Sequence, residues 1–145
     1  MDLRTSIDVS ATGLHAQALR MRVIAENLAN TDSVAKTPGG EPYRRRVATF
    51  RAHLDKAVGG TTVQIASITP DKSDFGRIYQ PGNPAADGAG YVQTPNVNGP
   101  IEMADMRAAQ RSYQANLNAI EAARTMVWQG ALSASCKTLF AALHP

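Results

Sequence analysis

Two pairs of acidic residues have the types and spacing that could support chemistry. Glu102 and Asp105 lie three residues apart in a predicted helix, so their carboxylates would share one face and could act as an acid–base pair. A simpler interpretation is favoured, because negative charge in the first turns of a helix interacts well with the helix dipole. Asp71 and Asp74 resemble half of a calcium-binding loop, but the glycine and the closing glutamate are missing. Neither pair predicts a catalytic or metal site.

The other side chains that commonly bind metals or act as nucleophiles are scattered. The three histidines, His15, His53 and His144, lack ligand-like spacing, and the single cysteine, Cys136, cannot form an internal disulfide. The serines lie outside any nucleophile motif, and the glycine-rich turn at 87–90 lacks the lysine of a phosphate-binding loop. We therefore expect no enzyme activity, no cofactor and no metal.

The chain is mildly basic, with a net charge of +3 and a pI near 9.3. Its clearest basic cluster is Arg44, Arg45 and Arg46, with Arg51 close behind them in the sequence. Nucleic acid binding would need a broad basic face with interleaved aromatic rings, and only Tyr43 and Phe50 are near. The arginines are therefore predicted to lie in a solvated strand or loop or at a contact with another protein, and no nucleic acid partner is expected.

Large apolar residues are scarce. Leu, Ile, Val and Phe together supply 28 of the 145 residues, whereas Ala alone supplies 24. This is the low edge of what a chain needs to bury a core by itself, so we expect full order only with partners. No apolar run reaches the length of a membrane span, and no membrane insertion is expected. Residues 1–8 lack the apolar core of a Sec signal peptide.

A seven-residue period predicts a long N-terminal helix. Four apolar residues recur at that spacing: Ile7, Leu14, Met21 and Leu28. An alanine lies four residues after each of the first three. A seam of period 3.5 over three to four heptads is typical of a coiled coil. Gly13 should weaken the helix locally, and the helix would be roughly 40 Å long.

The C-terminal part repeats this design. Pro100 and Glu102 suit the first turn of a helix, and no Gly or Pro interrupts residues 101–129. Four apolar positions again recur every seven residues: Met106, Tyr113, Ile120 and Val127. Met103 and Leu117 flank that stripe, each three residues before one of its positions. A second long helix is predicted.

Residues 31–100 have a different texture, with seven of the eight prolines and short strands predicted at 43–50, 62–68, 77–79 and 90–93. The predicted fold class is mainly α with a small β-rich insertion, in which long N- and C-terminal helices pair as a coiled-coil-like core. The expected divisions are an N-terminal helix of an inner core at 1–33, a β-rich or irregular insertion at 34–99, and a C-terminal helix of the inner core at 100–145. The two helices would form one discontinuous domain.

Asparagines near the end of the first seam are its most unusual residues. Asn27 and Asn30 lie one turn apart in AENLANTDS, although asparagine is a poor helix former and costly to bury. A polar seam residue fixes register, because each unpaired buried amide costs about 1–3 kcal/mol. We hypothesise that Asn27 and Asn30 set the register against neighbouring helices, with Asn116 doing so on the second helix. The alternative is that they cap the helix together with Thr31, and both hypotheses stay open.

Five stretches together resemble a known family. AENLANTDSV at 25–34 is similar to the Asn-rich signature of bacterial flagellar axial proteins. The other four follow in order: PYRRRVATF at 42–50, QPGNPAADGAGYV at 80–92, TPNVN at 94–98 and EMADMRAAQRSYQANLNAI at 102–120. They resemble the proximal-rod members of that family, over roughly residues 5–128.

The resemblance implies a structural role without catalysis. Such proteins stack helically into the drive shaft that transmits torque and encloses the export channel, with terminal helices inside and the insertion outside. The implied partners are other rod proteins, copies of the same chain, and the flagellar type III export apparatus. The implied location is the rod in the periplasm, reached without a Sec signal.

The expected assembly interface combines the seam positions with the asparagine-rich stretch: Ile7, Leu14, Met21, Asn27, Leu28, Asn30, Thr31, Met106, Tyr113, Asn116, Leu117, Ile120 and Val127. The arginine cluster is a candidate for a partner contact. The alternatives are another rod subunit of the same family or, from a different class, a small basic helical nucleic-acid-binding module that uses the arginine cluster.

Overall fold

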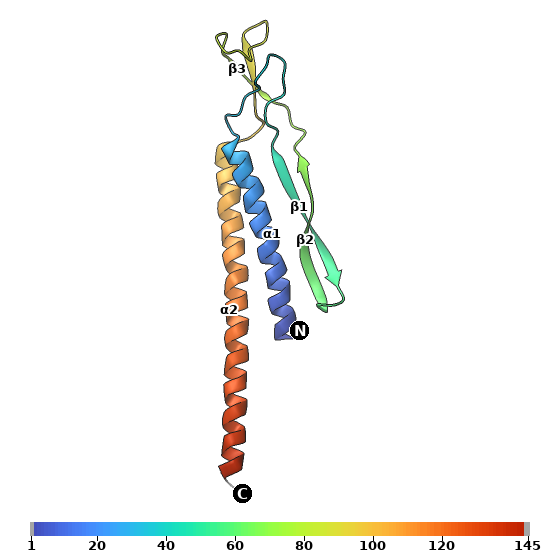
Figure 1. Cartoon of the computed structure of the whole chain (residues 1–145), viewed down its shortest axis with the longest axis vertical. Helices are drawn as coiled ribbons and strands as arrows, with labels where there is room; N and C mark the ends of the chain where they lie inside the picture. Colours follow the sequence, from blue (N-terminus) through green and yellow to red (C-terminus); the bar gives the residue numbers. More distant parts are fainter. Residues whose placement is uncertain (1, 144–145) are drawn as a thin grey trace.

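The computed structural model describes residues 2–143, with side chains described through residue 131. Two long helices and two small antiparallel sheets form an elongated molecule (Figure 1). The elements follow in chain order: α1 Leu3–Ala29, β1 Arg46–Asp55, β2 Gly60–Pro70, β3 Gly76–Tyr79, β4 Tyr91–Thr94 and α2 Gly99–Leu143.

Helix α1 is the central layer. It packs against α2 on one side and against β1 and β2 on the other, and within the described residues α2 packs against no other helix or strand (Figure 1). The chain runs along α1 towards the tip that holds β3 and returns along α2, so the two helices are antiparallel (Figure 1). Helix α1 therefore needs apolar residues on two faces.

Strands β1 and β2 form a long hairpin. They pair from Arg46 opposite Pro70 to Asp55 opposite Gly60, with a shift in register after Thr49. A hydrogen bond from Thr5 Oγ1 to the carbonyl oxygen of Val58, at 3.2 Å, holds the hairpin turn against the start of α1. The hairpin thus lies along α1 for most of the length of the helix.

The tip of the molecule is a small separate sheet. Strands β3 and β4 pair antiparallel, and Val92 of β4 is completely buried against Ala35 and Ala85. The carboxylate of Asp87 accepts hydrogen bonds from the backbone N–H groups of Ala89 and Tyr91, each at 2.9 Å, which shapes the turn before β4. The tip is held by these local contacts.

Small side chains allow α1 and α2 to approach closely. Ala109 and Ala123 are the buried apolar residues of the described part of α2. A Cβ atom placed on Gly13 would lie only 2.9 Å from Nδ2 of Asn116, so the Asn116 side chain of α2 packs closely against the backbone of α1 at Gly13. The glycine expected to weaken α1 instead makes room for a side chain of α2.

The predicted fold class, mainly α with a small β-rich insertion, is wrong. The hairpin strands have 10 and 11 residues and form a third layer beside the two helices. A second two-stranded sheet builds the tip. The strand prediction at 43–50 began and ended too early, and the prediction at 62–68 was too short. The missed residues, 51–55, 60–61 and 69–70, are mostly solvent-exposed and carry no clear apolar pattern.

The prediction that the terminal helices pair as a coiled-coil-like core is also wrong. In a coiled coil the seam residues would be the buried ones. Here Leu14, Met21 and Leu28 are only half-buried, while the buried residues of α1 are Ala16, Val23, Ile24 and Asn27. The reason is that α1 divides its apolar surface between a helix and a hairpin, which a single-seam pattern does not represent.

Candidate functional site

A cluster of hydrogen-bonded polar side chains lies where α1 ends and α2 begins. We call it the polar clasp, and it has six members: Asn27, Tyr43, Arg45, Asp71, Asn96 and Glu102. They come from both helices, the segment before β1, the segment after β2 and the segment before α2. The clasp therefore joins every major part of the chain except the tip.

Asn27 is the hub of the clasp and is 1% exposed. Its Nδ2 donates to the carbonyl oxygen of Arg46 at 2.8 Å and to Oε2 of Glu102 at 3.0 Å. Its Oδ1 accepts from the hydroxyl of Tyr43 and from the backbone N–H of Arg46, both at 2.9 Å. All the donor and acceptor positions of the amide are thus used inside the chain.

Glu102 supplies the buried charge of the clasp. It is 1% exposed, and its Oε1 accepts a hydrogen bond from Nε of Arg45 at 2.5 Å. The same guanidinium lies 3.4 Å from Asp71 and 3.7 Å from Asp105. Removing a carboxylate from water is costly unless it is paired and hydrogen-bonded, and Glu102 is both.

Asn96 connects the remaining segments. Its Oδ1 accepts from the backbone N–H of Arg45 at 2.7 Å, and its Nδ2 donates to the carbonyl oxygen of Asp71 at 3.2 Å and to Oγ of Ser73 at 2.9 Å. Asn96, the first asparagine of the TPNVN stretch, therefore bridges the segment that enters the hairpin and the segment that leaves it.

The electrostatics of the clasp favour the charged forms of Arg45 and Asp71 and the neutral form of Tyr43. Burial acts to lower the pKa of Arg45, but the hydrogen bond and charge of Glu102, then those of Asp71, outweigh it and raise that pKa above its ordinary value. The backbone N–H of Ser73 is the main cause that lowers the pKa of Asp71. Partial burial opposes that effect, while the Ser73 hydroxyl and Arg45 add to it. Burial is the main cause that raises the pKa of the Tyr43 hydroxyl.

The other residues of the asparagine-rich stretch cap α1. Asn30 is the C-cap residue, and its Nδ2 donates to the carbonyl oxygen of Glu26 at 2.8 Å. The hydroxyl of Thr31 donates to the carbonyl oxygen of Leu28 at 2.9 Å. These bonds satisfy carbonyls that a helix end leaves open. Asn27 and Asn30 thus have different local partners, and only Asn27 reaches other elements.

The predicted interface residues of the seams lie along the two helices. Eight apolar positions are half-buried: Ile7, Leu14, Met21, Leu28, Met106, Tyr113, Leu117 and Ile120. Val127 is 47% exposed. Asn116 is half-buried against Gly13 and donates to the carbonyl oxygen of Ser112 at 3.0 Å. None of these side chains belongs to the clasp.

The arginine cluster separates into three environments. Arg45 lies in the clasp, while the guanidinium of Arg44 stacks over the ring of Phe75 at 4.1 Å. The Arg46 side chain is 56% exposed and lies 3.7 Å from Glu26. The three neighbours in sequence therefore do not form one basic face.

Four members of the clasp were not among the predicted site residues: Tyr43, Asp71, Asn96 and Glu102. Glu102 lies in the first turn of α2, as the helix-dipole interpretation requires, but that interpretation missed its buried partners. No spacing rule links residues so far apart in the chain. The one available signal was that several stretches of the family resemblance hold a clasp residue, although their roles were not predicted.

The bonds of the clasp join segments that are far apart in the chain. Among the described residues, no three His, Cys, Asp or Glu side chains are grouped closely enough to hold a metal ion. No helix in the described part of the chain has both the length and the apolar character needed to cross a membrane.

Known proteins are similar to this chain over most of its length. Residues 89–135 match the family model described as flagellar basal body rod FlgEFG protein C-terminal. The chain is 46% identical over 125 residues to a flagellar basal-body rod protein FlgC of Agrobacterium fabrum, which covers 86% of this chain and 90% of that protein.

Two further relatives carry the same name. The Salmonella typhimurium protein is 40% identical over 129 residues, or 88% of this chain and 94% of the relative. The Bacillus subtilis protein is 40% identical over 137 residues, or 84% of this chain and 91% of the relative. The similarity thus extends over both helices and the hairpin.

Proposed function

This chain belongs to the FlgC family of flagellar basal-body rod proteins, and from that membership we propose that it polymerises helically in the proximal part of the rod. It is a structural subunit of the flagellar basal-body rod. The single observation that carries this conclusion is the 46% identity over nearly the whole chain. In the proposed assembly, repeated copies form the drive shaft that transmits torque and encloses the export channel.

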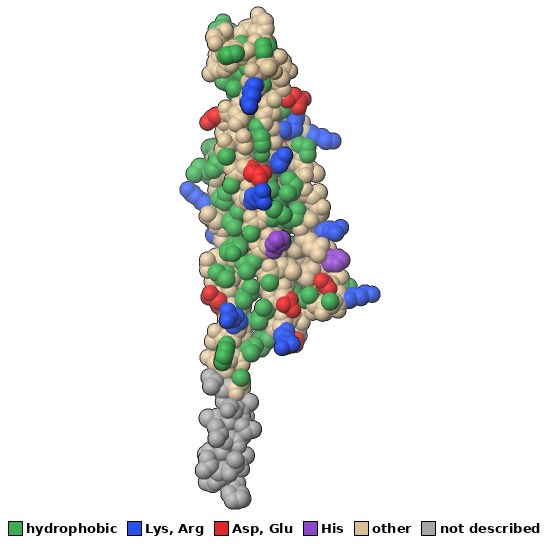
Figure 2. Space-filling view, viewed as in Figure 1, with side chains coloured by type: hydrophobic (Ala, Val, Ile, Leu, Met, Phe, Trp, Pro, Cys, Tyr) green, Lys and Arg blue, Asp and Glu red, His purple; other side chains and the backbone are tan. Residues whose placement is uncertain are grey.

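The shape of the chain supports such an assembly. Apolar side chains are exposed along one face of the elongated molecule, with charges of both signs between them (Figure 2). Ile101 and Met103 at the start of α2 are 53% and 50% exposed, and Trp128 near the end of its described side chains is 67% exposed. Apolar patches of this kind are typical of surfaces that contact other proteins.

The proposal also assigns each part of the chain to a position in the rod wall. Residues 1–33 and 100–145 form the inner part of the rod wall, and residues 34–99 form the outer part. The seam positions that are half-buried in one chain contact neighbouring subunits through their exposed remainder. Arg46 has the exposed guanidinium of the arginine cluster, and this group is available to contact another protein.

The polar clasp gives this subunit stiffness. A drive shaft must pass torque between its inner and outer parts without shear inside the subunit. The clasp joins both helices to the hairpin at one point through Asn27, Arg45 and Glu102. Its buried ion pair and fully used amide hold one geometry, because alternative geometries would leave polar groups unpaired.

Location and export complete the proposal. The protein belongs to the flagellar basal body, and we place it in the periplasmic rod after export through the flagellar type III apparatus. Its partners are other rod components, and its role needs no catalysis. The nucleic-acid alternative has lost its support, because Arg44 and Arg45 are engaged within the chain.

The experiment is complementation in a flagellated bacterium that lacks its own FlgC protein. We expect the chain to restore swimming and to be present in purified basal bodies. Leu14→Asp and Ile120→Asp should abolish both, since each puts a charge on a half-buried helix position. Asn118→Asp on the exposed face of α2 is the matched control and should swim.

Two outcomes contradict the proposal. One is the absence of the chain from basal bodies in cells that express it well. The other is normal swimming by both aspartate variants at Leu14 and Ile120.

A further inference from the structure

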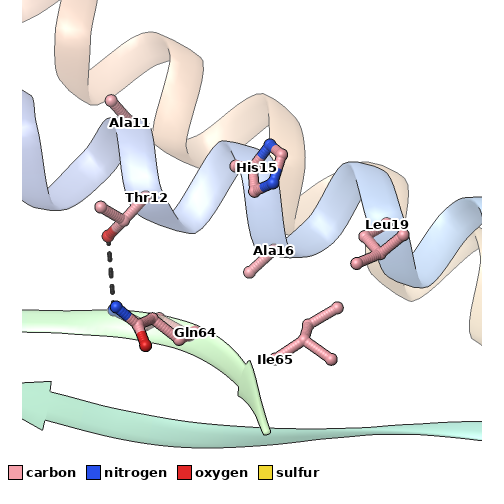
Figure 3. Close-up of a pocket in the computed structure, with 8 residues that line it drawn as sticks. Ala11, Thr12, His15, Ala16, Leu19, Gln64 and Ile65 are labelled. Carbon is pink, nitrogen blue, oxygen red and sulfur yellow. Dashed lines mark hydrogen bonds between the residues drawn. The ribbon is translucent and has the colours of Figure 1, made fainter. Parts of the chain in front are cut away.

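An uncharged groove lies between the middle of α1 and strand β2. Its volume is about 590 Å³. Ala11, His15 and Leu19 line it from α1, and Gln64 and Ile65 line it from β2 (Figure 3). The lining contains no Asp, Glu, Lys or Arg. A charged segment in this groove would lose water without gaining an ion pair, so the groove favours an uncharged occupant.

One segment of the same chain has matching chemistry. Helix α2 has 45 residues and α1 has 27, and the start of α2 lies level with the end of α1 through the bond between Asn27 and Glu102. The last 18 or so residues of α2 therefore run past the start of α1, roughly 27 Å at 1.5 Å per residue (Figure 1). We call residues 126–143 the overhang.

The overhang is apolar where its side chains are described. Met126, Val127 and Trp128 are 56%, 47% and 67% exposed. By sequence, residues 126–143 contain one charged residue, Lys137. A tryptophan left two-thirds exposed on such a helix is the residue type most enriched at the centres of protein interfaces.

We propose that the overhang of one copy docks in the groove of a second copy. The inference rests on the proposed function, because it identifies the contact through which copies of a rod subunit join. The groove and the overhang lie on different parts of one chain, so each copy offers both halves of the contact. Such a head-to-tail contact repeats along an open helical assembly when its rotation does not close into a ring. A second copy therefore accounts both for the groove and for the exposed side chains of Met126, Val127 and Trp128.

Trp128 provides the first test, because it is the only tryptophan of the chain. We expect its fluorescence emission to shift to the blue as the concentration of the purified protein rises, since docking removes the indole from water. Ala11→Glu places a charge in the neutral groove at an exposed helix position and should weaken the association roughly tenfold or more. Ala25→Glu is the matched control on α1 outside the groove and should keep the shift.

Disulfide trapping provides the second test. In a Cys136→Ser background, a mixture of a Gln64→Cys chain and a Val127→Cys chain should form a cross-linked dimer. A Leu54→Cys chain, which is exposed on the same hairpin outside the groove, should not cross-link with Val127→Cys. Circular dichroism of every variant checks that the helices are retained, and the cross-link needs no charged substitution.

The outcomes separate this inference from the rod function. Cross-linking at Gln64 together with a shift that Ala11→Glu removes supports it. If Gln64→Cys traps only a different rod protein, a second copy is the wrong occupant. If neither signal forms while Ala11→Glu still supports rods and swimming, the groove is not an assembly contact, although the rod role stands. If the chain never enters basal bodies, the rod role fails first.

Discussion

At the scale of single residues, Asn27 uses its amide more completely than any simple capping role needs. Asn27→Leu keeps the volume roughly similar and improves helix propensity. It leaves Tyr43, Glu102 and the backbone of Arg46 without their partner. We expect a loss of about 2–4 kcal/mol in the free energy of unfolding, because buried polar groups left unpaired cost 1–3 kcal/mol each.

Urea unfolding of the purified chain measures this loss. Asn118→Leu, on the exposed surface of α2, is the control and should change stability by no more than about 0.5 kcal/mol. Equal stability of the variants at Asn27 and Asn118 would show that the amide of Asn27 contributes little to the fold.

The ion pair between Arg45 and Glu102 carries the second prediction. Glu102→Gln keeps the shape of the side chain but removes the buried charge opposite Arg45. We expect it to cost about 2–3 kcal/mol, less than a fully buried pair because Arg45 is 24% exposed. Asp105→Asn should cost under about 1 kcal/mol, since that carboxylate is 38% exposed and lies 3.7 Å from Arg45.

A double-mutant cycle with Arg45→Met separates the pair from its surroundings. A coupling energy near zero would mean that Glu102 is stabilised by Asn27 alone.

Asp71 makes stability depend on pH. Its pKa is lowered in the folded chain, mainly by the backbone N–H of Ser73, so the folded state binds that proton less readily than the unfolded state. The stabilisation is complete above the ordinary Asp value of about 4 and is lost as the pH falls through the lowered value. Asp71→Asn should therefore be less stable than the wild type between pH 5 and 8, with a difference that shrinks below about pH 4.

Denaturant midpoints at a series of pH values check this prediction. Asp74→Asn changes a nearby exposed carboxylate and serves as the control. A difference between wild type and Asp71→Asn that grows on acidification would have the wrong sign and reject the explanation.

At the scale of elements, Gly13 inside α1 and Gly130 inside α2 should respond in opposite ways to alanine. Gly130→Ala meets nothing within 4 Å and should stabilise α2 by about 0.5–1 kcal/mol. Gly13→Ala gains the same propensity, but its Cβ would lie 2.9 Å from Asn116 and must displace that side chain. We expect Gly13→Ala to show no gain or a net loss.

Adding Asn116→Ala to Gly13→Ala should recover the gain, and thermal unfolding of the three variants measures it. Equal stabilisation by both glycine replacements would show that the close approach of the helices is not a constraint.

The elements also show what the sequence can predict. The seven-residue period located both helices because it depends only on neighbouring residues. It gave the wrong packing, since it cannot reveal that α1 lies between a helix and a hairpin. Glu102 was assigned to the helix dipole because its burial depends on Asn27 and Arg45, which reach it only after folding. Local patterns predict elements, whereas the clasp depends on contacts between distant segments.

At the scale of the whole molecule, protection should be graded along its length. Val23, Ile24 and Asn27 are buried near the clasp, whereas residues 125–131 are exposed. We expect backbone amides at 23–27 to exchange slowly in a dilute monomer and those at 125–131 to exchange fast. Hydrogen exchange with mass spectrometry compares the two sets, and the same measurement on assembled rods should show protection at 125–131. Equal protection of both sets in the monomer would contradict the gradient.

The bond between Asn27 and Glu102 also has a consequence in time. Its two residues are 75 positions apart in the chain. At roughly 5–20 residues per second, a ribosome needs about 4–15 s after making Asn27 before Glu102 exists. During that interval α1 lacks Glu102 and the whole of α2, and most of the stability of a helix comes from packing against such partners. Until α2 has been made, the new chain therefore lacks the contacts between its two helices. The order of synthesis thus delays folding.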